Sequence, residues 1–182
     1  MIRANNLARI AVKRTIRPLY AWHSAVPYAC FWDTGTGAVG GTVLASAAGS
    51  VYPGQVAVKT TGELMRLSAG GASALPFGLF NNFIGGTMDE LAGGTEIGVW
   101  VGGRDAVFEV LAGFSSTETP FASTFGAAAV AANGTAGGIG IYADSAGRLT
   151  DAAGSGFRVA RLIEAVSTSK VIVQLSLSEV AG

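Results

Sequence analysis

The chain consists largely of short apolar runs separated by glycine-rich turns. Residues 49–67, GSVYPGQVAVKTTGELMRL, show this pattern, because their valines and leucines alternate with small or polar neighbours. Such alternation is typical of half-buried β-strands. Pro53-Gly54 and Thr60-Thr61-Gly62 favour turns, since proline presets φ and glycine tolerates positive φ. The segment therefore predicts short, half-buried strands that build a surface.

Further hairpins are predicted in the middle and at the end of the chain. Residues 96–101 and 106–111 flank Gly102-Gly103-Arg104-Asp105, a good hairpin turn. The last pair, FRVARLIEAV and KVIVQLSL, alternates around a short turn at residues 167–169. Weaker patterns predict strands at 26–32, 39–46, 139–143 and 148–150, with turns at 33–37 and 144–147.

Three segments are less regular. Residues 75–83 contain Pro76 and Gly78, so we expect an edge strand or a loop that packs its phenylalanines. Residues 88–91 are expected to form one helical turn. Residues 121–132 are ambiguous, because AAAVAA favours a helix and its flanks do not. Together, roughly ten short strands with Gly-rich turns predict an all-β fold, either a compact β-barrel or a β-sandwich.

The composition indicates a protein that contacts other proteins. The chain has 182 residues, of which 49% are apolar and only 13% are charged. Ordinary soluble domains carry about a quarter charged residues. A surface with so few charges leaves weakly polar patches facing water, and such patches usually mark protein contacts. We therefore expect a homo-oligomer or a larger assembly.

Charge is distributed unevenly although the net charge is zero. Residues 1–20 carry five basic groups and no acid, whereas residues 21–182 carry seven basic and twelve acidic groups, which gives +5 against −5. The apolar positions of the first segment fit neither a helix nor a strand, and Pro18 ends whatever forms. We predict a basic, extended N-terminal arm at residues 1–20 and a single β-rich domain at residues 21–182.

A basic arm has three possible fates: binding nucleic acid, lying on an acidic protein surface, or remaining a solvated tail. Nucleic acid usually requires a denser basic run, and the rest of the chain is acidic, so direct nucleic-acid contact is not expected. The aromatic residues that follow the arm favour a protein partner, because aromatic side chains are enriched in interface cores; alternatively, they fill the local core. The predicted partner-binding residues are Arg3, Arg9, Lys13, Arg14, Arg17, Tyr20 and Trp22.

The single cysteine and the hydropathy pattern bear on location. Cys30 cannot form an intrachain disulfide, which favours assembly in a cytosolic environment and a buried structural thiol. No apolar run approaches the length of about 18 residues that spans a membrane. The basic residues spread through the N-terminal segment also argue against a secretory signal. We expect no contact with membranes.

Candidate chemical motifs each have a simpler explanation. Residues 35–40, GTGAVG, match G-x-G-x-x-G, but strand-like sequence follows where a dinucleotide site needs a helix, so we predict a turn. His23 is the only histidine and has no partners for a catalytic triad or a zinc site. The two carboxylates of Asp89 and Glu90 supply too few oxygen ligands for a calcium site. We expect Thr87 and Glu90 to form a helix capping box instead.

Asp105 and Glu109, in the predicted middle hairpin, are expected to be solvated or to face a basic partner. We predict no catalytic residues, no cofactor and no metal, and hence no enzyme.

The order of these segments resembles the capsid decoration, or cement, proteins of tailed bacteriophages. The resemblance covers residues 50–182 and is carried by PGQVAVKTTGELMRLSAGG, LPFGLF, GVWVGGRDAVFEVLAG and GFRVARLIEAVSTSKVIVQLSL. It implies a compact β-body without enzymatic activity that binds the outside of the icosahedral shell formed by the major capsid protein. It also implies trimers, with dimers as the alternative, and in some members a terminal arm extended over the shell.

The expected function is therefore that of a structural virion protein, made in the host cytoplasm, which stabilises a phage capsid by bridging major capsid protein subunits. Two other classes remain open. One is another virion β-protein, such as a tail-tube or head-fibre subunit, which would form rings or tubes in isolation. The other is a carbohydrate-binding or adhesion module, which would bind glycans.

Overall fold

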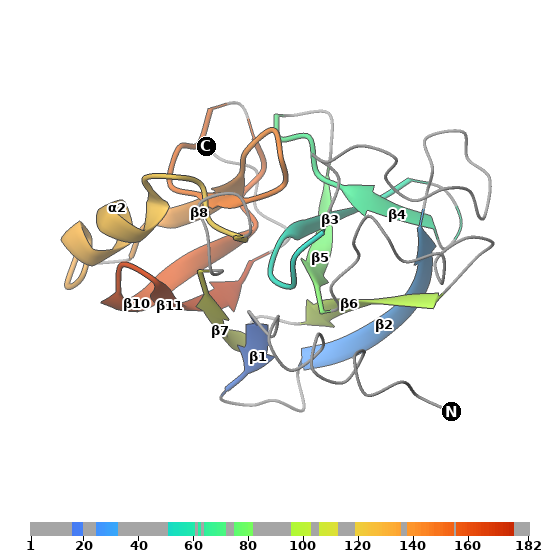
Figure 1. Cartoon of the computed structure of the whole chain (residues 1–182), viewed down its shortest axis with the longest axis horizontal. Coiled ribbons are helices and arrows are strands. Elements are labelled where there is room, and N and C mark those ends of the chain that lie inside the picture. Colours follow the sequence, from blue (N-terminus) through green and yellow to red (C-terminus); the bar gives the residue numbers. More distant parts are fainter. Residues whose placement is uncertain are drawn as a thin grey trace.

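A computed structural model places a six-stranded sheet, which carries the helix α2, beside a closed five-stranded barrel (Figure 1). It describes residues 16–19, 25–32, 51–60, 62, 64–71, 75–81, 96–102, 106–112, 119–135, 138–154 and 156–176. The all-β class predicted from the sequence is confirmed. The strands are β1 (Ile16–Pro18), β2 (Ala25–Trp32), β3 (Val56–Lys59), β4 (Leu64–Leu67), β5 (Pro76–Phe80), β6 (Glu96–Gly102), β7 (Val107–Leu111), β8 (Gly140–Ala143), β9 (Leu149–Thr150), β10 (Ala160–Ser167) and β11 (Lys170–Leu175), and the helix is α2 (Phe125–Ala131).

The chain begins in the six-stranded sheet, forms the barrel, and then returns to the sheet. The sheet has the order β1-β7-β11-β10-β8-β9, and the barrel has the order β2-β4-β3-β5-β6. Strand β1 pairs antiparallel with β7, with Arg17 opposite Glu109. The last residues of the predicted arm therefore form an edge strand of a sheet that is otherwise built from the C-terminal half of the chain.

The barrel closes through β2, which confirms the strand predicted at 26–32. This strand runs antiparallel to β6 along its length and parallel to β4 at Phe31 and Trp32. Cys30 lies fully buried inside, as the sequence indicated. The buried residues of the barrel interior are Cys30, Val51, Ala57, Met65, Phe80 and Val99.

Strand β3 is buried on both faces, so the prediction of a half-buried strand at this position is wrong. Val56 belongs to the core between the barrel and the six-stranded sheet, whereas Ala57 belongs to the barrel interior. The physical reason is that β3 lies in the part of the barrel wall that is covered by the core between the barrel and the six-stranded sheet. The alternation therefore separates two apolar environments: valine at position 56 faces the core beside the sheet, and the smaller alanine at position 57 faces the barrel interior. The turn at Gly54, with φ of 98°, is confirmed.

Strand β5 has a partner on each side, β3 and β6, so the prediction of an edge strand or loop at residues 75–83 is wrong. Pro76 is tolerated because it is the first residue of the strand, where a missing N–H disrupts the ladder least. Gly78 is required by close packing, since a Cβ there would lie 2.3 Å from the carbonyl oxygen of Trp100. Phe80 is buried in the barrel, as the sequence indicated.

The predicted hairpin of residues 96–111 is also wrong. Strand β6 pairs with β2 and β5 in the barrel, whereas β7 pairs with β1 and β11 in the sheet. The rings of Trp100 and Phe108 instead meet across the core, with centroids 5.8 Å apart. Each strand gains two pairing partners and a buried face in this arrangement, which a two-stranded hairpin would not provide.

The two C-terminal hairpins are confirmed. Strands β8 and β9 flank a turn in which the carboxylate of Asp144 accepts hydrogen bonds from the N–H groups of Ala146 and Arg148, each at 2.8 Å. Gly147 supplies a φ of 70°. Strands β10 and β11 pair as the alternation predicted.

Residues 125–131 of the ambiguous segment form the helix α2, which packs on one face of the β10–β11 hairpin. Phe125, Gly126 and Ala129 are its buried residues. After the helix, the side-chain amide of Asn133 donates to the carbonyl oxygen of Ala165 at 2.6 Å and accepts from its N–H at 2.7 Å. This amide takes the place of a neighbouring strand along β10 beyond the end of β8. The predicted elements at 33–37, 39–46 and 88–91 lie outside the described residues.

Candidate functional site

Arg17 is the one predicted partner-binding residue that falls within the described part of the chain. The other six, Arg3, Arg9, Lys13, Arg14, Tyr20 and Trp22, lie outside it, as do residues 35–40, His23 and Asp89-Glu90. Arg17 is held in β1 opposite Glu109 of β7, which places it at the edge of the six-stranded sheet. The site can therefore be built upward from this residue and its neighbours.

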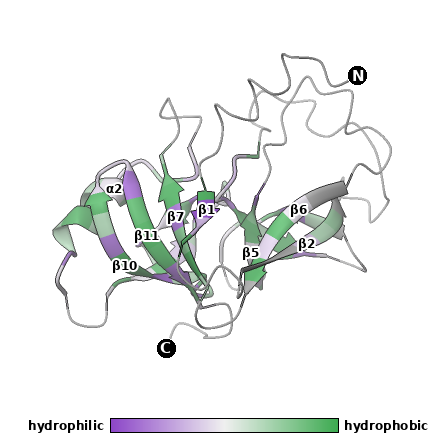
Figure 2. Cartoon of the chain, turned by 90° about the horizontal axis from the view of Figure 1, so that it is seen from below, coloured by the Kyte–Doolittle hydropathy of each residue, from purple (hydrophilic) through white to green (hydrophobic). Residues whose placement is uncertain are grey.

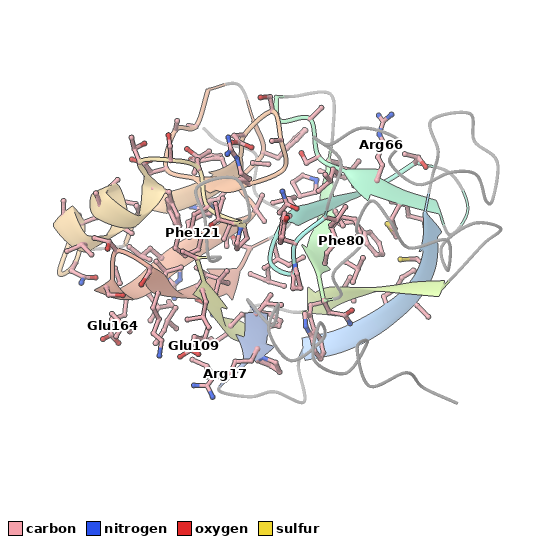
Figure 3. The ribbon with its side chains drawn as sticks, in the orientation of Figure 1. Arg17, Arg66, Phe80, Glu109, Phe121 and Glu164 are labelled. Carbon is pink, nitrogen blue, oxygen red and sulfur yellow. The ribbon has the colours of Figure 1, made fainter. Side chains whose placement is uncertain are left out.

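Arg17 forms a two-point ion pair with Glu109. Its Nε lies 2.7 Å from Oε1 of the carboxylate, and its Nη2 donates to Oε2 at 3.1 Å. The Nζ of Lys170, from β11, lies 3.1 Å from the same Oε2. Figure 3 shows Arg17 and Glu109 on the side of the sheet that faces away from α2. One carboxylate thus joins the edge strand to β11 across the intervening strand.

The carboxyl group of Glu109 is stabilised in its charged form. Burial by itself raises its pKa, because the charged form loses hydration. Hydrogen bonds from Arg17 and Lys170, together with their positive charges, outweigh burial and hold the pKa of Glu109 below its ordinary value. The prediction that Glu109 is solvated or faces a basic partner did not anticipate this arrangement, because Glu109 is buried and pairs with two basic side chains of its own chain; Asp105 lies outside the described residues.

Replacing Glu109 by glutamine should lower the free energy of unfolding by about 1–2 kcal/mol at neutral pH, because charge-assisted hydrogen bonds are lost. The folded pKa lies below the unfolded value of about 4.3. The carboxylate's contribution is therefore fully present above that pH and is lost as the pH falls through the folded pKa. Urea unfolding at pH 7 and pH 3 should show a stability difference that shrinks in acid.

The matched control is Glu164→Gln on β10, two strands from β7 in the same sheet, where the side chain is exposed. It should change stability by less than about 0.5 kcal/mol at either pH. A penalty for Glu109→Gln that is equally large at pH 3 and pH 7 would show that the loss is not electrostatic.

The strand register defines one continuous surface on the side of the sheet opposite α2, which we call the outer face. Residues that point inward from β7, β10 and β11 form the main core, so their strand neighbours point outward. Figure 2 looks onto this side, with β10, β11, β7 and β1 side by side and apolar and polar residues interspersed. The outer face comprises Arg17, Val107, Glu109, Leu111, Arg161, Ile163, Glu164, Val166, Lys170, Ile172 and Gln174.

A β-bulge in β10 adds one apolar side chain to this face. Leu162 lies opposite Val173 and Glu164 lies opposite Ile172, so Ile163 is an extra residue with no partner of its own. Strict alternation from Leu162 would turn Glu164 into the core. The bulge instead keeps both Ile163 and Glu164 outside, because bulges re-aim side chains relative to the pleat.

A second bulge follows at the end of the same strand. Ala165 lies opposite Val171 and Ser167 lies opposite Lys170, so Val166 is again an extra residue. Ala165 remains buried, while Val166 is turned out. Both bulges in β10 therefore present a β-branched apolar side chain to solvent.

Few large apolar side chains are strongly exposed within the described ranges. Ile163 and Val166 are 48% and 51% exposed, Leu75 before β5 is 60% exposed, and Val130 on α2 is 39% exposed. Only Ile163 and Val166 lie on the same strand and the same face. A hollow of about 300 Å³ borders Ile163 at the rim of the face, between β10 and the chain after α2.

Sequence reasoning missed the outer face for a definite reason. The alternation in FRVARLIEAV shows that β10 is amphipathic, but no residue type marks the two bulges, so the outward positions of Glu164 and Val166 were not predictable. The link between Arg17 and Glu109 spans 92 residues and left no local signal. The two charges could have been matched only after β1 and β7 were known to pair.

Within the ranges that the structure describes, no three side chains of histidine, cysteine, aspartate or glutamate gather as a metal site would require. Among the same residues, no helix is long and apolar enough to cross a membrane. The described part of the chain offers a broad mixed surface on an all-β body. Because only 13% of the residues in the chain are charged, we infer a structural or binding protein that acts by contact with other proteins.

The comparison with family models agrees with this class and makes it specific. The model described as Phage cement protein matches residues 1–182, so the chain belongs to the phage cement protein family. The resemblance inferred from the sequence is confirmed over the entire length. No match was found among curated proteins or among solved structures. The protein is therefore a structural, capsid-associated protein of the phage virion, and family membership indicates a non-enzymatic role.

Proposed function

We propose that the protein binds the outer surface of a phage capsid and stabilises the shell by bridging major capsid protein subunits. The observation that carries this proposal is the match of the phage cement protein family to the whole chain. The low content of charged residues, 13%, supports extensive contact with neighbouring proteins, including other copies of this chain. We expect a homo-oligomer, with a trimer as the first expectation and a dimer as the alternative.

The physical basis of stabilisation is mass action. A protein that binds only the assembled, mature lattice lowers the free energy of that state by an amount set by affinity and free concentration. At a concentration one hundred times Kd, this effect is about 2.7 kcal/mol per site. Many copies that bridge neighbouring capsomers would make opening of the lattice cooperative and costly.

The basic arm is proposed to lie in an acidic groove of the shell. Arg17 has a different task from the other four basic residues, because its guanidinium is engaged by Glu109 of the same chain. It anchors the root of the arm in β1, at the border of the outer face. The residues left for contact with the shell are Arg3, Arg9, Lys13 and Arg14.

Saturating decoration should raise the temperature at which expanded, undecorated capsids release their DNA. The expected shift is several degrees, because each occupied site adds a free-energy cost to opening that all subunits share. The measurement is DNA-dye fluorescence during heating, with and without the added protein.

The control is the same protein denatured by heat before mixing, which should leave the release temperature unchanged. Binding without any shift in release temperature or osmotic resistance would contradict the cement role. It would favour display or adhesion at the capsid surface.

A further inference from the structure

We propose that the outer face is the surface by which the body docks onto the capsid shell, with Ile163 and Val166 as its apolar anchors. This inference rests on the proposed function and deepens it, because it assigns the shell contact to one side of the molecule. The partner surface that fits is an apolar depression bordered by carboxylates on the major capsid protein. Three observations on the outer face support this assignment.

The first observation is the pair of bulges in β10. Each adds one residue that has no partner on β11, and in both cases that residue is a β-branched apolar side chain about half exposed to solvent. Ile163 and Val166 contribute little to the core from this position, whereas Leu162 and Ala165 beside them are buried. Bulges commonly re-aim side chains near functional sites. Here they leave two apolar side chains exposed along one strand, with Glu164 between them.

The second observation is that several polar groups of the outer face have partners within the chain, although the carboxylate of Glu164, between Ile163 and Val166, is exposed. Glu109 is paired with both Arg17 and Lys170. The Nε of Arg161 donates to Oε1 of Gln174 at 2.6 Å. Burying a charge without a partner is costly, so the groups of this face that are already paired can lose their water more easily. The outer face can therefore be covered by a partner without leaving Glu109 unpaired.

The third observation is where the chain outside the described residues joins the fold. Residues 1–15, with four basic groups and no acid, lead directly into β1, which borders the outer face. If the arm lies on the shell, the outer face should also be turned toward the shell, because β1 connects the arm to this face. The positive arm selects a partner surface with carboxylates, and residues 21–182 of another copy, with a net charge of −5, are the competing partner that the test separates from the shell.

The test compares aspartate substitutions at equally exposed apolar positions. Ile163→Asp and Val166→Asp should each weaken binding to undecorated capsids about tenfold or more, because an unpaired carboxylate would be buried in the contact. Leu75→Asp before β5 and Val130→Asp on α2 are matched controls and should bind like wild type. Binding is measured by co-sedimentation with capsids, and the thermal midpoint of each free variant confirms folding.

A labelling experiment gives a readout that does not depend on affinity. Cys30 is fully buried and is the only cysteine, so a maleimide should react chiefly with an introduced surface thiol. Ile163→Cys should label quickly in the free protein and at least tenfold more slowly on decorated capsids. Leu75→Cys should label at the same rate in both states.

The outcomes separate this inference from the proposed function. If wild-type protein fails to bind capsids, the proposed function fails. If wild type binds and Ile163→Asp, Val166→Asp and the labelling rates all match their controls, the outer face is not the docking surface. If the aspartate variants instead lower the oligomeric state in the absence of capsids, the face joins copies of this chain and the inference is overturned.

Discussion

Replacing Phe108 by alanine should destabilise the folded protein by about 3–5 kcal/mol, the range typical of a large aromatic residue removed from a packed core. Phe108 is fully buried, and its ring meets Trp100 of the barrel with centroids 5.8 Å apart. The same core contains Val56 and Leu79 from the barrel strands β3 and β5. Loss of this ring should therefore weaken the contact that joins the sheet to the barrel.

The shape of the unfolding transition is the second part of this expectation. We propose that the sheet and the barrel belong to one domain, so the wild-type protein should unfold in a single cooperative step. Urea denaturation measures this step, with circular dichroism and tryptophan fluorescence as the two signals. Phe77→Ala is the control, since Phe77 lies partly exposed and packs against the barrel core. Two separate transitions in wild type would show that the two units fold independently.

Deleting residues 1–15 should weaken capsid binding about 30-fold at physiological salt. The segment carries Arg3, Arg9, Lys13 and Arg14, and an exposed ion pair contributes up to about 1 kcal/mol. Four pairs at about 0.5 kcal/mol each sum to about 2 kcal/mol, which corresponds to this change in affinity. The deletion stops before β1, so the thermal midpoint of the body should be nearly unchanged.

Charge reversal provides a sharper version of the same experiment. Arg9→Glu with Arg14→Glu should weaken binding at least as much as the deletion, and raising the salt concentration should narrow the difference through screening. Arg66→Glu is the control, because Arg66 is exposed on β4 of the barrel and lies away from Arg17 (Figure 3). Equal binding of wild type and the deletion variant at physiological salt would identify the arm as a solvated tail.

Much of the local structure was predictable because it depends on residues close together in sequence. The turn at Asp144–Gly147 is held by one aspartate side chain and one glycine of positive φ, and both are recognisable by residue type. The β10–β11 hairpin joins two alternating runs over a tight turn, so its pairing needed no distant information. The sequence does not decide whether residues 125–131 form a helix, because an alanine-rich run with mixed flanks has no decisive local preference.

The errors have a common cause in non-local pairing. Strands β6 and β7 are adjacent in sequence and are separated by residues whose types favour a hairpin turn, yet each strand joins a different sheet. The pattern of β5 marked an edge because of Pro76, but its position between β3 and β6 depends on closure of the barrel. A period-2 pattern indicates that a strand has faces of different character, and it does not identify the neighbouring strand.

The all-β class, the family, the charge asymmetry and the turns at Gly54 and Asp144–Gly147 could be recognised from the sequence, because each depends on residue types and their local order. The tertiary structure was needed to show that β3 is buried on both faces, that β1 pairs with β7, and that Arg17 and Lys170 both pair with Glu109. The exposure of Ile163 and Val166 on one strand likewise depends on the tertiary structure, through the two bulges in β10. The reason is that register, bulges and ion pairs between distant strands are set by how two sheets pack around a shared core, and that packing is a property of the whole chain.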